Sequence, residues 1–342
     1  MLPVTKEILT HHLLTMKDPV QGWLKQGHFP PVLLFCGPKG IGKSEMATYL
    51  AQWILCHKSD KAAGPCGECP SCGKALRGTW IDFTCITPDT EGSESASRQT
   101  LKIDQFRSLK ATQGFGALES NYRITLIPNV EQLTLQAANS ILKLLEEPPA
   151  SWLLFLTTSD PTLLLPTILS RCQKMTLRPL PTPTLEALLR AKSIDPQCAL
   201  VCAALAQGSW QRACDLSEKE AWEKRRDIFA FLEEPRTNLN PLLEWAAKDA
   251  NHLDLLIDQL EHLSAELLAW SLQASGGYTW KNSDGAKSLN IHVKNTLNKL
   301  GTPSKAREFW LAQSERLARA RGEVILPLNK KLLIQDILLS WF

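Results

Sequence analysis

The strongest restriction on the fold of this chain comes from the segment 37–44, with the sequence GPKGIGKS. It fits the pattern G-x-x-x-x-G-K-S/T, whose backbone amides surround phosphate oxygens while the N-terminus of the following helix adds positive potential. The apolar run 32–36 precedes the segment, and a helical pattern at 43–55 follows it with an apolar face. A strand, a glycine loop and a helix in this order predict an α/β domain built on a parallel sheet.

The same segment predicts a nucleotide site. Lys43 is expected to reach the outer phosphates and Ser44 to ligate magnesium, so a nucleotide such as ATP with Mg²⁺ is the expected ligand. A vestigial loop that only ends a strand is the alternative. The predicted nucleotide-binding residues are Gly37, Pro38, Lys39, Gly40, Ile41, Gly42, Lys43 and Ser44.

A second apolar strand, 123–127, ends in Pro128 and Asn129. In ATPases built on such a loop, acids at this place hold magnesium and polarise the attacking water, and neither of these two residues supplies that charge. We interpret Glu131, two residues further on, as a surface residue at the start of the next helix, with an inward-facing carboxylate as the alternative. The sequence therefore predicts nucleotide binding without turnover by this chain's own site.

Strands and helices alternate through the first half of the chain. Besides the two strands already named, we expect strands at 81–86 and 152–156, helices at 6–26, 103–112 and 134–146, and a polar loop at 88–99. Such alternation favours a parallel sheet that helices cover on both faces. The first domain is expected to comprise residues 1–177.

Four cysteines lie in a short insert after the helix of the loop. Cys66, Cys69 and Cys72 are separated by two-residue gaps, which let neighbouring thiolates converge on one ion. Cys56, ten positions upstream, would close a tetrahedral site, so we predict structural zinc held by these four thiols, with His57 as an alternative to Cys56. Free thiols in a loose loop are the alternative to a metal. An iron–sulfur cluster is disfavoured because no cysteine follows Cys72 at the ferredoxin spacing.

Two further features suggest contacts between charged groups. Glu146 and Glu147 end the helix 134–146, where the helix dipole disfavours negative charge; this suggests a basic partner, although a solvated helix end fits equally well. Arg171 lies between two short apolar segments. It can pair with a carboxylate of its own domain, or project from the domain edge toward a phosphate in an adjacent subunit. The residue pattern leaves both alternatives open.

The second half of the chain reads as helical. Prolines punctuate residues 178–183, and no convincing strand follows them. Short helical patterns at 185–216 and longer amphipathic ones beyond them predict two all-α domains, 178–218 and 219–342. The charge run 218–226 is interpreted as a solvated helix face.

The composition argues against a dedicated nucleic-acid binder, a membrane protein and a secreted protein. A net charge of +3 over 342 residues, with scattered Lys and Arg, does not indicate a dedicated nucleic-acid binder. No apolar run approaches the roughly 18 residues of a membrane span, and residues 1–17 lack the pattern of a secretion signal. We therefore expect a cytoplasmic protein without membrane contacts, whose ten cysteines do not form disulfides.

These features together resemble one family. The phosphate loop, the four-cysteine insert directly after its helix, LKLLEEPP at 142–149 and TILSRC at 167–172 are similar, in order and spacing, to the delta-prime subunits of bacterial DNA polymerase III clamp loaders, a family of AAA+ proteins. The resemblance is dense over about residues 30–177, weaker at 207–213 and limited to helical character after about residue 220. It implies an AAA+ core with a zinc module at about 56–72, a small helical lid and a C-terminal helical collar that assembles into a hetero-pentameric ring.

The resemblance also implies roles for two arginines. Arg171 would act in trans, as an arginine finger on ATP bound by a neighbouring motor subunit, and Arg212 would correspond to the lid arginine that senses nucleotide. The implied function is to assist ATP-dependent loading of the sliding clamp onto primed DNA, with the motor subunits and the delta subunit as partners. Some members of the family have a degraded phosphate loop, whereas this loop is intact.

Two other functions stay open. One is an ATPase motor in its own right, with Glu131 as the group that positions water. The other is a zinc-dependent nucleic-acid-binding module, although residues 63–73 carry no basic residue.

Overall fold

The computed structural model describes residues 6–58, 64–86, 117–248, 250–272, 280, 282–323 and 329–341. The polar loop expected at 88–99 and the helix expected at 103–112 lie outside these residues. The chain divides into two compact units between Leu180 and Pro181. The first unit holds a β-sheet, and the described part of the second unit contains helices and no strand.

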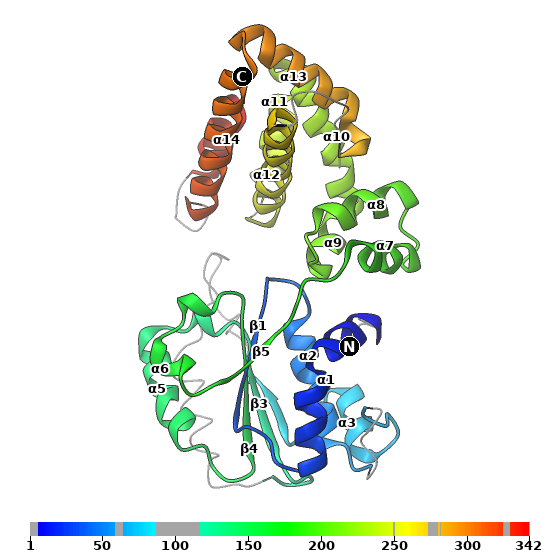
Figure 1. Ribbon diagram of the computed structural model, residues 1–342, viewed down its shortest axis with the longest axis vertical. Helices are drawn as coiled ribbons and strands as arrows, with labels where there is room; N and C mark the ends of the chain where they lie inside the picture. Colours follow the sequence, from blue (N-terminus) through cyan, green and yellow to red (C-terminus); the bar gives the residue numbers. More distant parts are fainter. Residues whose placement is uncertain are drawn as a thin grey trace. The chain divides into compact units, whose positions relative to one another are not determined.

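A five-stranded parallel sheet forms the centre of the first unit, with the strand order β2-β3-β4-β1-β5 (Figure 1). The strands are β1 (Val32–Cys36), β2 (Phe83–Cys85), β3 (Arg123–Ile127), β4 (Trp152–Thr158) and β5 (Gln173–Thr176). All neighbours run parallel, which confirms the predicted sheet. Cys36, at the end of β1, is in register with Thr158 of β4 and Thr176 of β5, so the carboxyl ends of these strands lie together.

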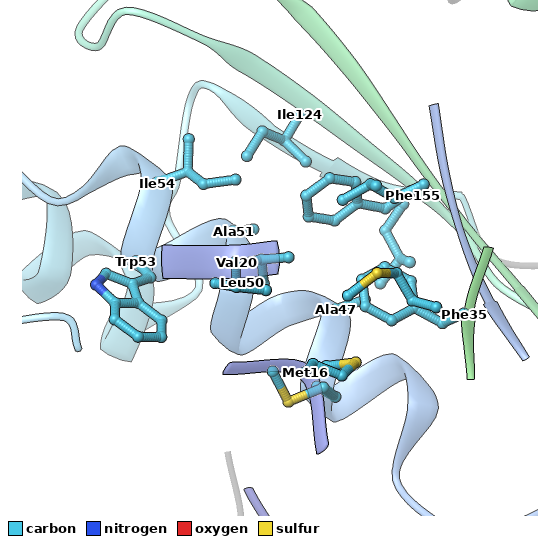
Figure 2. Close-up of a cluster of buried hydrophobic side chains, with 14 of the residues drawn as sticks. Met16, Val20, Phe35, Ala47, Leu50, Ala51, Trp53, Ile54, Ile124 and Phe155 are labelled. Atoms are coloured by element: carbon cyan, nitrogen blue, oxygen red, sulfur yellow. The ribbon is translucent and has the colours of Figure 1, made fainter. Parts of the chain in front are cut away.

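Helices pack on both faces of this sheet, as the alternating sequence pattern predicts. On one face, α1 (Lys6–Gln26) and α2 (Lys43–Leu55) pack against side chains such as Phe35 and Phe155 (Figure 2). On the other face, α5 (Leu135–Glu146) and α6 (Pro166–Leu169) complete a second apolar cluster. Because β1 and β4 are buried on both sides, their sequences read as nearly continuous apolar runs.

Three short elements complete the first unit. They are α3 (Pro70–Arg77), η1 (Val130–Gln132) and η2 (Pro161–Leu163). The cysteine spacing did not predict α3, although its ends carry ordinary helix signals. Pro70 occupies the first turn, the Cys69 side chain accepts the N–H of Cys72, and Gly78 ends the helix with φ 70°.

The second unit begins with three short helices in the region where the sequence predicts two or three. They are α7 (Thr182–Ala191), α8 (Pro196–Leu205) and α9 (Trp210–Ser217). Longer helices follow: α10 (Lys219–Glu233), α11 (Pro235–Ala246), α12 (Ala250–Leu272), the short η3 (Ser283–Gly285), α13 (Ala286–Leu300), α14 (Pro303–Glu323) and α15 (Lys330–Leu339). Helix α12 packs along α14. Within the described residues, no helix is both long and apolar enough to cross a membrane.

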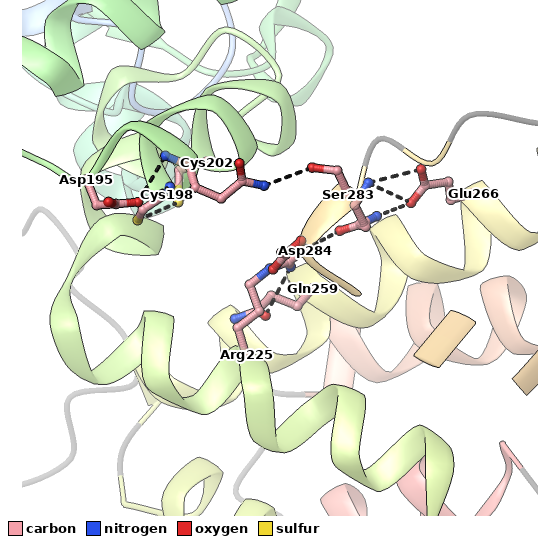
Figure 3. Close-up of polar contacts among 10 residues, drawn as sticks. Asp195, Cys198, Cys202, Arg225, Gln259, Glu266, Ser283 and Asp284 are labelled. Atoms are coloured by element: carbon pink, nitrogen blue, oxygen red, sulfur yellow. Dashed lines mark hydrogen bonds and ion pairs between the residues drawn. The ribbon is translucent and has the colours of Figure 1, made fainter. Parts of the chain in front are cut away.

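The charge run 218–226 is not a uniformly solvated face, which corrects the expectation from sequence. Arg225 is buried within the helical unit, with 3% of its side chain exposed. Its guanidinium pairs with Asp284 at 2.6 Å and also bonds Asn282 (Figure 3). The physical reason is the helical period, which turns Arg225 toward the apolar side of α10 while its neighbour Arg226 stays exposed.

Candidate functional site

The phosphate loop joins the carboxyl end of β1 to the N-terminus of α2. Gly42 has φ 97° and Gly37 has φ 154°, values that L side chains rarely adopt. A Cβ at Gly37 would also lie 2.7 Å from the carbonyl oxygen of Leu177. No side chain caps α2, so its first backbone N–H groups face outward with the geometry that binds an anion.

Lys43 is buried in this loop, with 6% of its surface exposed. Its Nζ donates to the carbonyl oxygens of Gly37 and Pro38, both at 2.9 Å. Burial lowers the pKa of Lys43, and the nearby negative charge of Glu131 opposes this shift. The ammonium group is held inside the loop by neutral carbonyls, and a phosphate would be a stronger partner.

His12 of α1 supports the loop and was missed by sequence reasoning. Its buried ring bonds through Nε2 to the carbonyl oxygen of Ile41 at 2.7 Å. Burial lowers the pKa of His12, which favours the neutral ring as the donor of this bond. A signal was present in the sequence, because Ile8, His12, Met16 and Val20 recur every four residues and are all buried.

The end of β3 lacks an acid, as the sequence indicates. Asn129 has φ 50°, and its N–H donates to the hydroxyl of Thr157 at 3.0 Å. This left-handed turn leads directly from β3 into η1. The first carboxylate after the strand is therefore that of Glu131, within η1.

Glu131 points inward, which corrects its interpretation as a surface residue. Its Oε1 accepts the N–H of Ser159 at 3.0 Å and also the hydroxyl of that residue, just beyond the end of β4. Its Oε2 is buried and has no hydrogen-bond partner among the described residues. The partner lies 28 positions away, so local sequence could not show which way the carboxylate faces.

The four predicted metal ligands come together at the other end of α2. The Sγ atoms of Cys56, Cys66, Cys69 and Cys72 all lie within 4.8 Å of one another. Tetrahedral zinc with Zn–S bonds of about 2.3 Å would hold its sulfurs about 3.8 Å apart. Two of the sulfur pairs lie 4.0 and 3.9 Å apart. The four thiols therefore fit a single metal ion, and His57 does not belong to the group.

Backbone N–H groups point at these sulfurs. Cys69 donates to the Sγ of Cys66 at 3.3 Å, and Cys72 donates to the Sγ of Cys69 at 3.5 Å. Hydrogen bonds from the N–H groups of Glu68 and Cys69 lower the pKa of Cys66 to about 6. Such donors favour the thiolate at Cys66, which is the form that binds a metal, whereas burial raises the pKa of Cys72 to about 12.

Arg171 lies just after α6 and pairs with a carboxylate of its own unit. Its Nη2 lies 2.8 Å from Oε1 of Glu146, and its Nη1 donates to the carbonyl oxygen of Thr167 at 2.8 Å. The Arg171 side chain is 34% exposed and that of Glu146 is 48% exposed. Glu146 therefore has a basic partner within the chain, and Glu147 beside it is exposed.

Arg212 belongs to the second unit, on α9. Its Nε lies 3.2 Å from Oδ2 of Asp258 on α12, and 20% of its side chain is exposed. Burial lowers the pKa of Arg212, and the charge of Asp258 opposes this shift.

The predicted residues thus form separate groups. Residues 37–44 and Glu131 lie together at the carboxyl ends of the strands. The cysteines lie at the opposite end of α2, Arg171 lies between α6 and β5, and Arg212 lies in the second unit. The structure brings together a complete phosphate loop and the carboxylate of Glu131, and it keeps the metal group apart from them.

Known proteins resemble this chain over most of its length. Residues 15–181 match the family model described as DNA polymerase III, delta subunit. Over 318 residues the chain is 30% identical to DNA polymerase III subunit delta′ of Pseudomonas aeruginosa, and the alignment covers 90% of each protein.

Two further relatives match a smaller share of the chain. Subunit delta′ of Bacillus subtilis is 32% identical over 193 residues, which are 56% of this chain and 55% of that protein. DNA polymerase III subunit tau of Escherichia coli is 31% identical over 214 residues, which are 61% of this chain and 31% of that protein.

Proposed function

Because the chain belongs to the family of DNA polymerase III delta-prime subunits, we propose that it is a clamp-loader subunit that assists ATP-dependent loading of the sliding clamp onto primed DNA. In this role it joins motor subunits and the delta subunit in a hetero-pentameric ring, in the cytoplasm. Residues 178–218 serve as its lid and residues 219–342 as the collar through which the ring assembles.

The chain's own nucleotide site binds ATP with Mg²⁺ and does not turn it over. The buried ammonium group of Lys43 and the free N-terminus of α2 support binding of phosphates. Pro128 and Asn129 support the lack of turnover, since neither can polarise an attacking water. Arg212 senses this nucleotide once it is released from Asp258, and the four cysteines hold zinc as a structural ion.

The observation that carries the proposal is the setting of Arg171. Its guanidinium is partly exposed and pairs with a carboxylate that is itself about half exposed. Such an exposed ion pair contributes about 0–1 kcal/mol, so exchanging Glu146 for a phosphate of a neighbouring subunit costs little. A guanidinium delivered in this way stabilises the charge that develops during phosphoryl transfer, and we assign Arg171 as this finger in trans.

The test is DNA- and clamp-stimulated ATP turnover of the reconstituted complex with Arg171→Ala in this subunit alone. Turnover at one motor site should fall by about a hundredfold or more while the ring still assembles. Arg178→Ala, which removes another exposed arginine, is the matched control and should leave turnover unchanged.

Glu146→Gln separates the finger from a purely structural ion pair. It breaks the pair but keeps the guanidinium, so turnover should stay near the unaltered value if Arg171 acts in trans. Equal losses in Glu146→Gln and Arg171→Ala would instead show that the pair only holds the edge of the domain together.

A second candidate function is an ATPase motor, and the inward carboxylate of Glu131 favours it. Lys43→Ala in the assembled complex distinguishes the two. Under our proposal turnover of the complex stays within about twofold of the unaltered value, because the motor sites lie in other subunits. Collapse of turnover would favour the motor.

A further inference from the structure

Glu131 is half-buried, and its carboxylate has one unused oxygen. Ser159 occupies Oε1 with two hydrogen bonds, whereas Oε2 is buried and has no hydrogen-bond partner among the described residues. A buried polar atom without a partner is costly, and a native protein usually satisfies it with water, an ion or a ligand. Oε2 is therefore a candidate contact atom for a water, an ion or a ligand.

That place lies beside the phosphate loop. Ser159, which holds Glu131, directly follows Thr158, and the carbonyl oxygen of Thr158 accepts the N–H of Gly37 at 3.3 Å. Strand β4 is also the direct neighbour of β1, from which the loop starts (Figure 1). The charge of Glu131 acts on Lys43, where it opposes the effect of burial on the pKa. These contacts place the carboxylate at the same strand ends as Lys43.

The unused oxygen matches the chemistry of a nucleotide's cation. Magnesium prefers oxygen ligands, keeps several waters, and is usually held by one or two carboxylates together with phosphate oxygens. Ser44, the next residue after Lys43, offers a hydroxyl at the start of α2. The strand end itself offers only Pro128 and Asn129, and Glu131 is the first carboxylate after it. Glu45, in the first turn of α2, also acts on Lys43, but neither of its oxygens is among the buried atoms without a partner in the described part of the chain.

We infer that Glu131 is the protein carboxylate that holds the Mg²⁺ of a bound nucleotide, supplied from η1 two residues beyond the strand end. The inference rests on the proposed binding of ATP. In ATPases with such a loop, the acids at the strand end both hold the cation and polarise the attacking water, and here these two roles are separated. Glu131 holds the cation, and the amide at Asn129 leaves the attacking water without a base, so the nucleotide is retained and not cut.

The test measures the affinity of the full chain for ATP by calorimetry, with Mg²⁺ and in Mg²⁺-free buffer, for the unaltered chain and Glu131→Gln. The glutamine keeps an oxygen that can accept both bonds from Ser159, so the local fold is preserved. With Mg²⁺, Glu131→Gln should bind ATP about tenfold more weakly. Without Mg²⁺ it should bind at least as tightly as the unaltered chain, because a carboxylate repels the naked phosphates.

Mn²⁺ provides a readout that does not depend on affinity for ATP alone. It prefers oxygen ligands to thiolates, so it reports on this site and not on the cysteines. At a fixed concentration of ATP, adding the unaltered chain should lower the electron paramagnetic resonance signal of free Mn²⁺ below its value with ATP alone, and adding Glu131→Gln should lower it much less. Glu223→Gln, which removes an exposed carboxylate in the other unit, is the matched control and should behave as the unaltered chain.

The outcomes separate the inference from the function on which it rests. Equal weakening with and without Mg²⁺, or unchanged Mn²⁺ binding, would overturn the role of Glu131 while ATP binding stands. If the unaltered chain and Lys43→Ala both fail to bind ATP, the proposed binding fails and the inference fails with it.

Discussion

Asp258 of α12 holds two arginines that come from different helices. Arg212 of α9 and Arg321 of α14 both contact its carboxylate, and Arg212 also bonds Nε2 of His262 at 2.9 Å. A guanidinium can only donate, so this ring nitrogen must accept and the imidazole is neutral. One carboxylate and one uncharged ring thus fix Arg212 against α12.

This arrangement predicts a pH dependence of stability. Burial and the charge of Arg212 lower the pKa of His262 from 6.5 to about 4. Below pH 6.5, His262 binds a proton in the unfolded chain and stays neutral in the folded chain. The contribution of neutral His262 to the stability of the fold is therefore complete above pH 6.5 and is lost as the pH falls toward 4. When the pH falls from 7 to 5, the unfolding free energy of the unaltered chain should therefore decrease by about 1–2 kcal/mol more than that of His262→Gln.

Urea unfolding at the two pH values checks this prediction. The glutamine oxygen still accepts from Arg212, so the variant should remain folded at neutral pH. His28→Gln, which removes an exposed histidine, should keep the pH dependence of the unaltered chain. Identical pH dependence in both variants would mean that His262 titrates normally in the folded state.

At the scale of elements, the cysteine group joins α3 to the end of α2, and Trp80 links α3 to the edge strand of the sheet. Cys56 ends α2, and Cys72 lies within α3. The Trp80 indole donates to the hydroxyl of Ser71 at 3.2 Å, and its ring lies 5.1 Å from that of Phe83 in β2. A metal ion would therefore set the position of a short helix that is too small to be stable alone.

Cys72→Ser should release the bound zinc and loosen residues 64–77 while the sheet persists. The reason is that three remaining thiols hold zinc much more weakly and α3 loses its anchor. Metal content by mass spectrometry should fall to near zero, and tryptic cleavage after Lys74 or Arg77 should accelerate about tenfold. Cys85→Ser, which removes an exposed thiol outside the group, should change neither measurement.

Elements with local signals could be predicted from the sequence. The segments 32–36, 123–127 and 152–156 are apolar because the strands are buried on both faces, and Thr134 caps α5 by accepting the N–H of Ala137. Helix α3 could not be predicted with the same ease. Its cysteines and glycines serve the metal group, and they obscure the helical pattern.

The orientation of single side chains was predicted less well, both at the site and in the helical unit. Glu131 finds its partner 28 positions away, Arg171 finds Glu146 25 positions away, and Arg225 finds Asp284 59 positions away. Spacing along the chain says nothing about such pairs, because they form only when distant elements pack. The phosphate loop and the cysteine group were predictable because their chemistry depends on short, fixed spacings.

At the scale of the whole molecule, different interactions stabilise the two compact units. The first is held by a sheet between two apolar clusters. The second uses a polar network as well, in which the buried Arg225 of α10 bonds Asp284 and Asn282, and the exposed Gln197 of α8 bonds Ser283 (Figure 3). The network joins the short helices at the start of this unit to the longer ones that follow.

Removing Arg225 should therefore destabilise the second unit strongly. Arg225→Ala leaves the Asp284 carboxylate without its partner in a largely buried place, at an expected cost of about 3–5 kcal/mol. Arg226→Ala removes the exposed neighbour and should cost less than about 0.5 kcal/mol. Chemical denaturation of both variants makes the comparison, and similar losses for the two would show that the network contributes little.

Helix α2 has a site at each end, with the phosphate loop before Lys43 and the cysteine group at Cys56. Its 13 residues span about 20 Å, whereas the Debye length at physiological ionic strength is about 8 Å. The charge of a metal ion at one end is therefore largely screened at the other. In mechanical terms α2 is a stiff spacer, and a metal at the cysteines fixes the direction of the helix axis at the phosphate loop without altering the electrostatic potential there.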